Sequence, residues 1–492
     1  MSAVDHVDVL IVGAGLSGIC AAYHVQTGLP GKSYAILEAR EALGGTWDLF
    51  RYPGIRSDSD APTLGFAFRP WTGDRSIADG ASILAYIEET ARQTGVADRI
   101  CYGHKVIFAA WRTAEALWTL EIETADGPRT MTCRFLFGCT GYYDYDGGHS
   151  PTWAGMETFA GRVIHPQHWP DDLDYRGKRV AVIGSGATAV TLVPAMVDGA
   201  AHVTMIQRTP TYIAALPGSD AVSNAFRRVL PAGAAHAATR WKNIALGMAT
   251  YAVAQNVPGW LRRKVRNGQR AALGPDFDID RHFTPPYQPW DQRFCVAPDG
   301  DLFDALNSGR ASIVTGTIRN WTRGGLVMES GETVDADIIV TATGLRIKLI
   351  GGMTATVDGE PVEIAKTYAY KGAMYSGIPN FAVALGYTNA SWTLKCELIA
   401  RYVVRLIRHM DANGLDWAKP RAPGPDVAAR PAIGLTSGYI QRAADQLPRQ
   451  TDRRPWRLYQ NYLADLRFLR YGPVTDEMEF GRALRIERRE AA

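Results

Sequence analysis

The hydrophobic pattern at the start of the chain predicts a short buried strand followed by a helix. Apolar side chains dominate residues 7–12, and apolar positions return at helical spacing after three glycines. Gly13, Gly15 and Gly18 form G-x-G-x-x-G, in which the glycines permit a tight turn, close approach of a pyrophosphate and close helix–strand packing. A second predicted strand ends at Glu38, about 20 residues further on, where a carboxylate binds ribose hydroxyls. The pattern is typical of a dinucleotide-binding βαβ unit; the alternative is a glycine-rich turn that binds nothing.

The same pattern recurs at residues 179–196. An apolar strand leads into G-x-G-x-x-A, made by Gly184, Gly186 and Ala189, and the next predicted strand ends near Arg208. An Arg in this position pairs with a 2′-phosphate, which an acidic residue would repel. We therefore expect NADPH rather than NADH in this unit, with a charge-assisted bond of about 1.5–3 kcal/mol, or roughly 10- to 150-fold in affinity. A solvated Arg on a loop is the alternative.

Two unlike dinucleotide units predict two dinucleotides, an FAD that stays bound and an NADPH that binds and dissociates. The fold class is therefore α/β, with two Rossmann-like domains and a helical insertion in the NADPH domain. The segments "CTGYY" (139–143) and "IIVTATG" (338–344) are predicted to be strand ends where the chain crosses between domains. The predicted limits are 1–145 for the first part of the FAD domain, 146–170 for a linker, 171–215 for the first part of the NADPH domain, 216–284 for a helical subdomain, 285–345 for the second NADPH part and 346–492 for the second FAD part.

Two further stretches are predicted to be helical. Leu394, Leu398 and Tyr402 repeat at intervals of four within 386–407, which predicts a loop that enters an amphipathic helix. The stretch 216–284 is rich in Ala, Arg and Trp, and Pro258–Gly259 is its one turn signal, so we expect helices that narrow access to the flavin. Its basic run "WLRRKVR" suits contact with anionic lipid, although a charged helix face is usually solvated.

Composition limits the classes of function. The chain has 492 residues, 46% hydrophobic and 21% charged, which is ordinary for a globular protein of several domains. A net charge of +3 is too small to indicate nucleic-acid binding. The six cysteines form no C-x-x-C pair, so we expect no metal site, no disulfide framework and a reducing, cytoplasmic location. The N-terminal sequence has no basic region typical of a signal peptide, and no apolar run is long enough to span a membrane.

The segment 43–60 indicates where the electrons go. A disulfide reductase of this general plan would carry a redox pair of cysteines here, and the segment has none, so dioxygen is the natural acceptor. We predict that FAD contacts the first glycine turn, the end of the second strand and this segment: Gly13, Gly15, Ser17, Gly18, Glu38, Gly45, Thr46, Trp47, Asp58 and Val106. We predict that NADPH contacts Arg56, Gly184, Ser185, Gly186, Ala187, Thr188, Ala189, Arg208 and Thr209.

The segment "FAGRVIHPQHWP" (159–170) carries a family fingerprint. It matches F-x-G-x-x-x-H-x-x-x-W-P through Phe159, Gly161, His165, Trp169 and Pro170, directly before the second nucleotide unit. The chain thereby resembles the type I Baeyer–Villiger monooxygenases. "FRYPGIRSDSD", "HPQHWPDDLDY", "IGSGATAVTLVPA", "PWDQRFCVAPDGDLF" and "GYTNASWTLK" extend the likeness to the mycobacterial ethionamide-activating subgroup, over residues from about 6 to 462.

The resemblance implies an activity. In this family NADPH reduces FAD, and the reduced flavin and O2 form a C4a-peroxide that converts ketones to esters or lactones and can oxygenate sulfur. Arg293 matches the family's peroxide-stabilising Arg, and Asp58 matches the acid that positions it; the alternative is a buried ion pair that holds two loops. Many relatives have Lys before this Arg, where this chain has Gln292, which shifts part of NADPH binding elsewhere. Arg suits the role because it stays charged at any working pH.

The resemblance also assigns the fingerprint to domain rearrangement. His165 is expected to be a hydrogen-bonded hinge residue and Trp169 a docking ring, with a purely structural histidine as the alternative. Trp392 and Asn389 are candidates for the substrate pocket, with core packing as the alternative for Trp392. An S- or N-oxygenase with little Baeyer–Villiger activity and a non-catalytic dinucleotide sensor remain as other functions.

Overall fold

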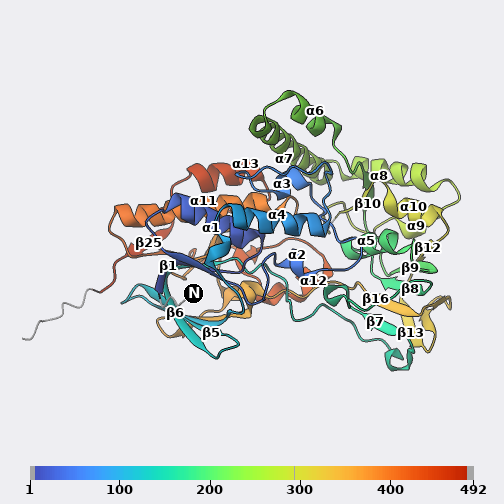
Figure 1. Ribbon diagram of the computed structural model, residues 1–492, viewed down its shortest axis with the longest axis horizontal. Helices are drawn as coiled ribbons and strands as arrows, with labels where there is room; N and C mark the ends of the chain where they lie inside the picture. Colours follow the sequence, from blue (N-terminus) through green and yellow to red (C-terminus); the bar gives the residue numbers. More distant parts are fainter. Residues whose placement is uncertain (1–5, 293, 485–492) are drawn as a thin grey trace, which may run out of the picture.

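The two predicted nucleotide units form two separate sheets in the computed structural model, which describes residues 6–292 and 294–484 (Figure 1). The first sheet has β1 (His6–Val12) between β2 (Tyr34–Leu37) and β6 (Arg129–Gly138), and both neighbours run parallel to it. β3 (Ile100–Cys101) pairs with β2, and β21 (Phe381–Val383) pairs with β6. The other strands of this sheet are β4 (Lys105–Arg112), β5 (Leu117–Glu123), β17 (Thr354–Val357), β18 (Glu360–Pro361), β19 (Ala369–Tyr370) and β20 (Met374–Tyr375).

The second sheet is parallel throughout. Its strands follow the order β12 (Ala311–Thr315), β9 (His202–Gln207), β8 (Arg179–Ile183), β16 (Ile338–Thr341) and β7 (Arg162–Ile164). The helices α5 (Ala187–Met196) and α10 (Asp301–Asn307) pack with it, and an antiparallel group, β13 (Ile318–Thr322), β14 (Gly325–Met328) and β15 (Thr333–Asp335), adjoins it. The edge strand β7 lies inside the predicted linker 146–170, so that segment contributes to the second sheet as well as joining the units.

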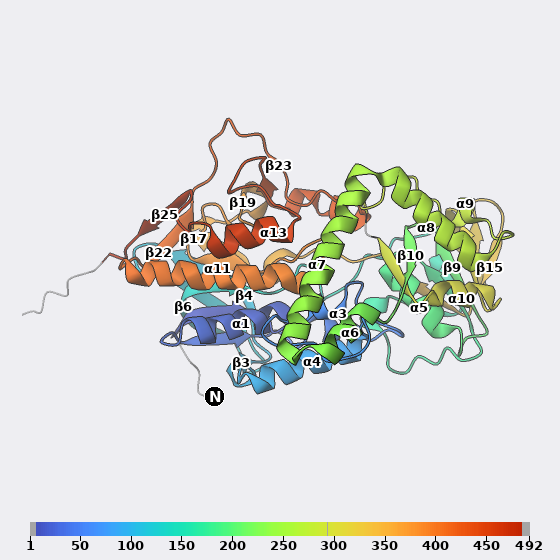
Figure 2. The ribbon, with the colours of Figure 1, turned by 90° about the horizontal axis from the view of Figure 1, so that it is seen from above.

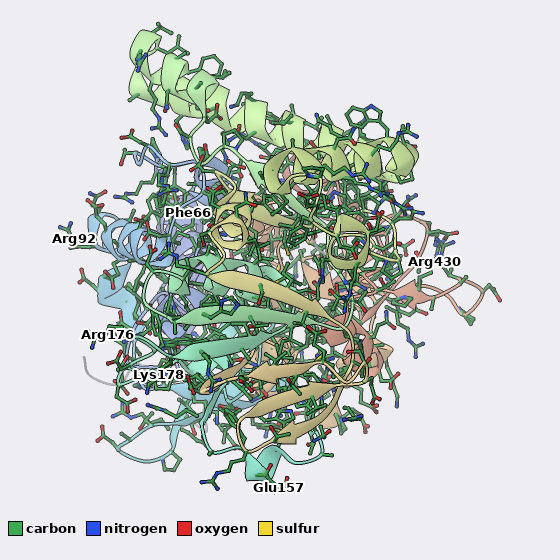
Figure 3. All side chains as sticks on the ribbon, turned by 90° about the vertical axis from the view of Figure 1, so that its right-hand side faces the viewer. Phe66, Arg92, Glu157, Arg176, Lys178 and Arg430 are labelled. Atoms are coloured by element: carbon green, nitrogen blue, oxygen red, sulfur yellow. The ribbon has the colours of Figure 1, made fainter. Side chains whose placement is uncertain are left out.

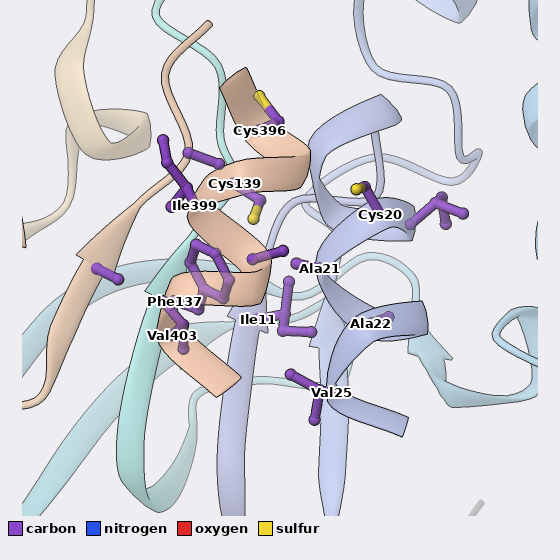
Figure 4. Close-up of a cluster of buried hydrophobic side chains, with 14 of the residues drawn as sticks. Ile11, Cys20, Ala21, Ala22, Val25, Phe137, Cys139, Cys396, Ile399 and Val403 are labelled. Atoms are coloured by element: carbon purple, nitrogen blue, oxygen red, sulfur yellow. The ribbon is translucent and has the colours of Figure 1, made fainter. Parts of the chain in front are cut away.

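Two helices that are far apart in the sequence cover one face of the first sheet. α1 (Leu16–Gly28) and α11 (Trp392–Ala412) lie side by side although more than 360 residues separate them (Figure 4). Cys20, Ala21 and Val25 of α1 meet Ile399 and Val403 of α11 over the sheet. The predicted apolar face of α11 is confirmed, because Leu394, Leu398 and Tyr402 are all buried. Burial of the nonpolar area of such faces is the main free energy that joins the two ends of the chain.

A helical arm projects from the second unit. It consists of α6 (Ala221–Val229), α7 (Ala232–Asn256) and α8 (Pro258–Leu273), and the break between α7 and α8 falls at the predicted Pro258–Gly259 signal. α9 (Ile279–His282) follows, and β10 (Ile213–Leu216) pairs with β11 (Cys295–Pro298) where the chain leaves and returns. The arm lies along the upper side of the molecule in Figures 1 and 3 and faces the reader in Figure 2.

Apart from α4, a helix of 14 residues, the remaining α-helices and β-strands of the described chain are short. With α4 included, they are α2 (Thr46–Leu49), α3 (Ala61–Leu64), α4 (Gly80–Gln93), α12 (Gly438–Arg442), α13 (Tyr462–Asp465), β22 (Trp417–Pro420), β23 (Arg430–Pro431), β24 (Arg449–Gln450) and β25 (Met478–Gly481). Within residues 6–292 and 294–484, no helix combines the length and apolar character needed to cross a membrane.

The chain crosses between the two units along two adjacent segments. The segments 142–149 and 344–348 run antiparallel and exchange backbone hydrogen bonds: Asp144 N–H donates to Arg346 O at 2.9 Å, and Lys348 N–H donates to Tyr142 O at 3.0 Å. These segments follow the two strand ends that the sequence marked as crossings. Paired crossings are a suitable hinge, because two short segments absorb any change in the relative orientation of two rigid sheets.

Candidate active site

A cavity of about 620 Å³ is lined by residues of both units. Many of the predicted cofactor residues line it, namely Gly13, Gly15, Ser17, Glu38, Gly45, Thr46, Trp47, Asp58 and Val106 of the FAD set, and Arg56, Ala187 and Thr188 of the NADPH set. The predicted pocket residues Asn389 and Trp392 line it too. The tertiary structure therefore brings together residues that are almost 380 positions apart.

The first glycine turn is built for a ligand at the start of α1. Gly13 has φ +105°, and a Cβ there would lie 2.6 Å from Cys139 O. Gly18 lets the helix pack closely on the turn, since a Cβ at this position would lie 1.8 Å from Gly13 O. Gly18 does not line the cavity. Gly15 differs, because its nearest protein neighbour would be 3.6 Å from a Cβ and the space beyond is the cavity. No side chain caps α1, so its first N–H groups are available to an anion.

Glu38, directly after β2, is hydrogen-bonded to this turn. Its carboxylate accepts hydrogen bonds from Ala14 N–H at 2.8 Å and from Arg40 N–H at 3.0 Å. Burial raises the pKa of Glu38 above its usual range, while these two N–H groups and the Arg40 guanidinium oppose the rise. Each carboxylate oxygen has a further lone pair, so Glu38 retains acceptors for ribose hydroxyls.

The second glycine turn repeats this construction. Gly184 has φ +143°, and a Cβ there would lie 2.3 Å from Ala342 O, whereas a Cβ on Gly186 would meet nothing within 4 Å. The Ser185 hydroxyl donates to Thr209 O at 2.9 Å, which ties the turn to the loop that carries Arg208. Arg208 is exposed directly after β9. Ala189 is fully buried against the sheet, so it contributes packing.

Of the two charged residues predicted for catalysis, Asp58 and Arg293, the structure describes only Asp58. Asp58 lines the cavity, and Arg56 pairs with Asp301 at the start of α10, which links the first unit to the second. Arg293 lies outside the described residues. Trp290 and Phe294, close to it on either side, both line the cavity.

Comparison with known proteins places the chain among flavoprotein oxygenases. Residues 11–71 match the model of an NAD(P)-binding Rossmann-like domain, and residues 80–220 match that of flavin-binding monooxygenase-like proteins. The chain is 54% identical over 474 residues to the FAD-containing monooxygenase EthA of Mycobacterium tuberculosis, covering 96% of this chain and 97% of the relative. It belongs to the FAD-containing monooxygenase family.

Other relatives agree with that assignment. The chain is 49% identical over 480 residues to the putative FAD-containing monooxygenase MymA of M. tuberculosis, which covers 96% of this chain and 97% of the relative. An NADP-bound steroid monooxygenase has a similar fold, with a TM-score of 0.75 at 20% identity over 97% of this chain and 100% of that one. An ε-caprolactone-bound cyclohexanone monooxygenase has a TM-score of 0.69 at 21% identity, covering 86% and 90%. The predicted fold class and family are thus confirmed.

The fingerprint of this monooxygenase lies on the seam between its units. His165 Nδ1 accepts from Gln167 N–H at 3.3 Å, so the proton resides on Nε2, which donates to Gly344 O at 3.2 Å. Gly148 leaves room for the ring, since a Cβ there would lie 1.9 Å from it. Burial lowers the pKa of His165, with the Gly344 hydrogen bond as the opposing effect, which keeps the ring neutral. His165 therefore contacts one residue of each crossing segment: its ring packs against Gly148 and bonds the carbonyl of Gly344.

The other fingerprint residues pack on the second unit of the monooxygenase. Phe159 makes an edge-to-face contact with Trp321, with ring centroids 5.7 Å apart. Gly161 lies against Asp337 O, which a Cβ would approach to 2.2 Å. Trp169 is partly buried against the core of the second sheet, and Pro170 follows it. The fingerprint thus packs along the second unit on both sides of His165, which is its contact with the seam.

Trp392 separates the cofactor cavity from a second, smaller one. Its indole N–H donates to the Ser17 hydroxyl at 2.9 Å, and its ring stacks on Tyr142 with centroids 5.1 Å apart. Behind it lies a chamber of about 80 Å³ with mainly apolar and aromatic walls, and Trp392, Tyr142, Tyr387 and Thr388 line both spaces. Tyr387 is held by a hydrogen bond to Asp465 at 2.7 Å.

An unsatisfied acceptor supports the fit of FAD. Asn389 donates to Gln460 O at 2.9 Å, while its Oδ1 is buried in the cavity wall with no hydrogen-bond partner among the described residues. A buried acceptor left alone costs free energy, which a ligand N–H would recover. Together with the open space at Gly15 and the uncapped start of α1, the residues present fit a flavin dinucleotide.

Several lining residues were not predicted from the sequence. They include Arg40, Tyr52, Tyr142, Tyr145, Lys348 and Tyr387. Arg40 pairs with Asp48 at 2.5 Å and also donates to Gly45 O at 3.1 Å, so it joins the second strand to the 43–60 segment. Tyr142 lies in "CTGYY", which the sequence marked as a crossing beside the cofactor, so a signal existed there. No motif marked Lys348, which reaches the cavity from the returning crossing segment.

Proposed function

We propose that this monooxygenase uses FAD, NADPH and O2 to convert ketones into esters or lactones and thioethers into sulfoxides. One oxygen atom enters the substrate and the other leaves as water, while NADPH supplies a hydride and a proton comes from solvent. Bound FAD supplies the reduced flavin that activates dioxygen. The non-catalytic sensor weighed from the sequence loses its support, because the close relatives are named monooxygenases.

The observation that carries the proposal is the apolar chamber beside the cofactor cavity. Four residues line both spaces, and the chamber walls are mostly aromatic and aliphatic. Such a pocket favours a small neutral substrate with an apolar body and a single polar group, which describes simple ketones and thioethers. A dry pocket also limits unproductive loss of reduced oxygen as hydrogen peroxide.

The chain's own residues would hold and orient the two dinucleotides. The uncapped N-terminus of α1 and the Glu38 carboxylate suit the pyrophosphate and ribose of FAD, and Asn389 Oδ1 suits a flavin N–H. The uncapped start of α5 and Arg208 suit NADPH, whose 2′-phosphate would pair with the guanidinium. NADP-bound neighbours of the same fold support this assignment.

Arg293 is proposed as the cation that stabilises developing negative charge on oxygen. Its sequence neighbours Trp290 and Phe294 line the cavity, and so does Asp58, the proposed positioning acid. Substitution Arg293→Ala is expected to leave flavin reduction by NADPH intact and to slow ester formation about 10²- to 10³-fold, measured by anaerobic reduction and by product yield. Exposed Arg319→Ala is the matched control. Ester formation at the normal rate in Arg293→Ala would remove Arg293 from this role.

The experiment that tests the function is a substrate panel. The purified protein is given linear, cyclic and aromatic ketones and aryl alkyl thioethers, and substrate-stimulated NADPH consumption is scored with product mass. We expect esters or lactones that are one oxygen heavier than the ketone, together with sulfoxides. Sulfoxides without any ester would favour the S- or N-oxygenase alternative. NADPH consumption that no panel member stimulates would contradict the proposal.

A further inference from the structure

The helical arm, residues 221–273, differs in charge from the rest of the molecule. From residue 221 to residue 275 the chain has nine Lys or Arg residues and no Asp or Glu, whereas the remainder has 44 basic and 50 acidic residues. The whole-chain charge of +3 therefore hides a strongly basic segment on an acidic body. The electrostatic field of such a basic segment acts locally, because screening by salt limits its range to about 8 Å at physiological ionic strength.

The exposed apolar side chains gather on the same segment. Seven of the twelve large hydrophobic residues that are exposed in the described chain belong to it, within a stretch of 39 residues: Val222, Val229, Leu230, Trp241, Leu246, Val257 and Trp260. Leu246 is 63% exposed and Trp260 46%. Scattered exposed leucines need no explanation, but a concentration of this kind marks an interaction site.

Basic side chains flank the apolar ones and have few internal partners. Among residues 6–292 and 294–484, no ion pair to a carboxylate is found for Arg228, Arg263, Lys264 and Arg270. Lys264 instead lies 5.2 Å from the centre of the Trp260 ring. Trp beside Lys and Arg at the edge of an apolar helix surface is the composition of segments that lie in the interface of a membrane.

We propose that the arm docks on an anionic lipid surface, with Leu246, Val257 and Trp260 in the headgroup region and Arg228, Arg263, Lys264 and Arg270 against the lipid phosphates. A second copy of the chain docked through the same face would bring the two basic surfaces together, and repulsion disfavours that. Nucleic acid would satisfy the charges but would leave the apolar side chains without a partner. In Figures 1 and 3 no other element lies above the outer side of the arm.

The position of the arm relates the lipid surface to the site. The inner residues Ala254, Leu261 and Val265 pack with Trp290 and Phe294, and both of these aromatic residues line the cofactor cavity. One layer of helix, about 10 Å thick, thus separates the lipid-facing side from the cavity. Docking would place the cavity close to apolar molecules dissolved in the bilayer.

The test is flotation of the purified full-length protein with vesicles. We expect binding to an equal mixture of phosphatidylcholine and phosphatidylglycerol, little binding to phosphatidylcholine alone, and weakening by salt. Removal of a basic side chain is expected to cost about fivefold in affinity, so Arg263→Glu with Lys264→Glu should weaken binding by at least about 25-fold. Leu246→Ser with Trp260→Ser should weaken it at least about tenfold, since the apolar contribution is lost.

Matched controls separate docking from general charge and from folding. Arg319→Glu with Arg323→Glu changes the net charge equally on an exposed hairpin of the second unit, and Leu463→Ser removes an exposed apolar side chain elsewhere. These controls should bind like the parent protein, and all variants should keep FAD content and NADPH consumption. Equal weakening by arm and control variants would overturn the proposal. So would absence of vesicle binding, tighter binding to duplex DNA than to vesicles, or arm variants that only convert an oligomer to a monomer.

Discussion

At the scale of single residues, the two glycine turns share a geometry that separates packing glycines from ligand glycines. Gly13, Gly18 and Gly184 each have a backbone oxygen within 3 Å of the place that a methyl group would occupy, so their lack of a side chain serves the fold. A Cβ on Gly15 would make an ordinary contact of 3.6 Å with Gly45, and one on Gly186 would meet nothing within 4 Å; both residues have extended backbone that any residue can adopt. These two positions therefore report on ligand binding alone.

A matched pair of substitutions follows from that difference. Gly15→Ala is expected to yield folded protein with greatly reduced FAD content, because the methyl group fills the approach path of the pyrophosphate. Gly186→Ala should keep FAD and raise the KM for NADPH at least about tenfold. Flavin absorbance and NADPH kinetics measure the two effects, and circular dichroism checks the fold. Full FAD content in Gly15→Ala would contradict the assignment of the first turn.

Arg208 determines nucleotide choice in our interpretation. Arg208→Ala is expected to raise the KM for NADPH about 10- to 150-fold and to leave that for NADH unchanged, because only the 2′-phosphate loses a partner. Steady-state kinetics with both nucleotides measure this, and Lys178→Ala, also exposed on the second unit, is the control. An unchanged preference for NADPH would mean that Arg208 is solvated.

At the scale of elements, the arm is inserted in the sequence of the second unit but anchored to the first. Arg240 of α7 pairs with Glu397 of α11 at 2.8 Å and donates to Gly65 O at 2.6 Å, and Asn243 donates to Asp60 at 2.7 Å. Arg240 and Glu397 are both buried. Burial disfavours the Glu397 charge, but His24, whose Nε2 lies 3.7 Å from Oε1, and the charges of Arg240 and Arg401 lower the pKa of Glu397 to about 2.

This anchor predicts a pH dependence of stability. The folded pKa of Glu397 is below its ordinary value of 4.5, so the stabilisation is complete above pH 4.5 and is lost as the pH falls toward 2. Glu397→Gln is expected to lose about 3 kcal/mol at pH 7 and to show a flatter decline in acid. Thermal unfolding at pH 7 and below 4.5 measures this, with exposed Glu115→Gln as control. Parallel curves for parent and Glu397→Gln would show that the carboxylate is not stabilised by its partners.

At the scale of the whole molecule, the two units meet through a cavity, the Arg56–Asp301 pair and the paired crossing segments. His165 adds a hydrogen bond at that seam, to the carbonyl of Gly344. Its ring bonds a backbone carbonyl and is not among the residues that line the cavity, which fits a hinge better than an acid or base. The seam is where nucleotide exchange and oxygen chemistry would be coupled.

Loss of the His165 hydrogen bond should act on the reductive step. His165→Ala is expected to retain FAD and to slow flavin reduction by NADPH about fivefold, because one hydrogen bond of about 1 kcal/mol no longer holds the units in register. Stopped-flow reduction measures the rate, and His202→Ala, which bonds Ser312 within the second sheet, is the control. Oxygenation lost with reduction intact would move His165 into the active site.

The sequence alone determined the chemistry that depends on local order. Strand, glycine turn and helix are contiguous, so cofactor roles for Gly13, Gly15, Glu38, Gly184 and Arg208 could be proposed from spacing, and the fingerprint identified the family. Long-range packing decided the rest. The pairing of Trp392 with Ser17, the anchor of Arg240 on Glu397 and the surface of the arm depend on which elements meet, and burial of apolar faces from distant segments sets that. No local pattern encodes such a meeting, because a helix face specifies that it needs a partner but not which one.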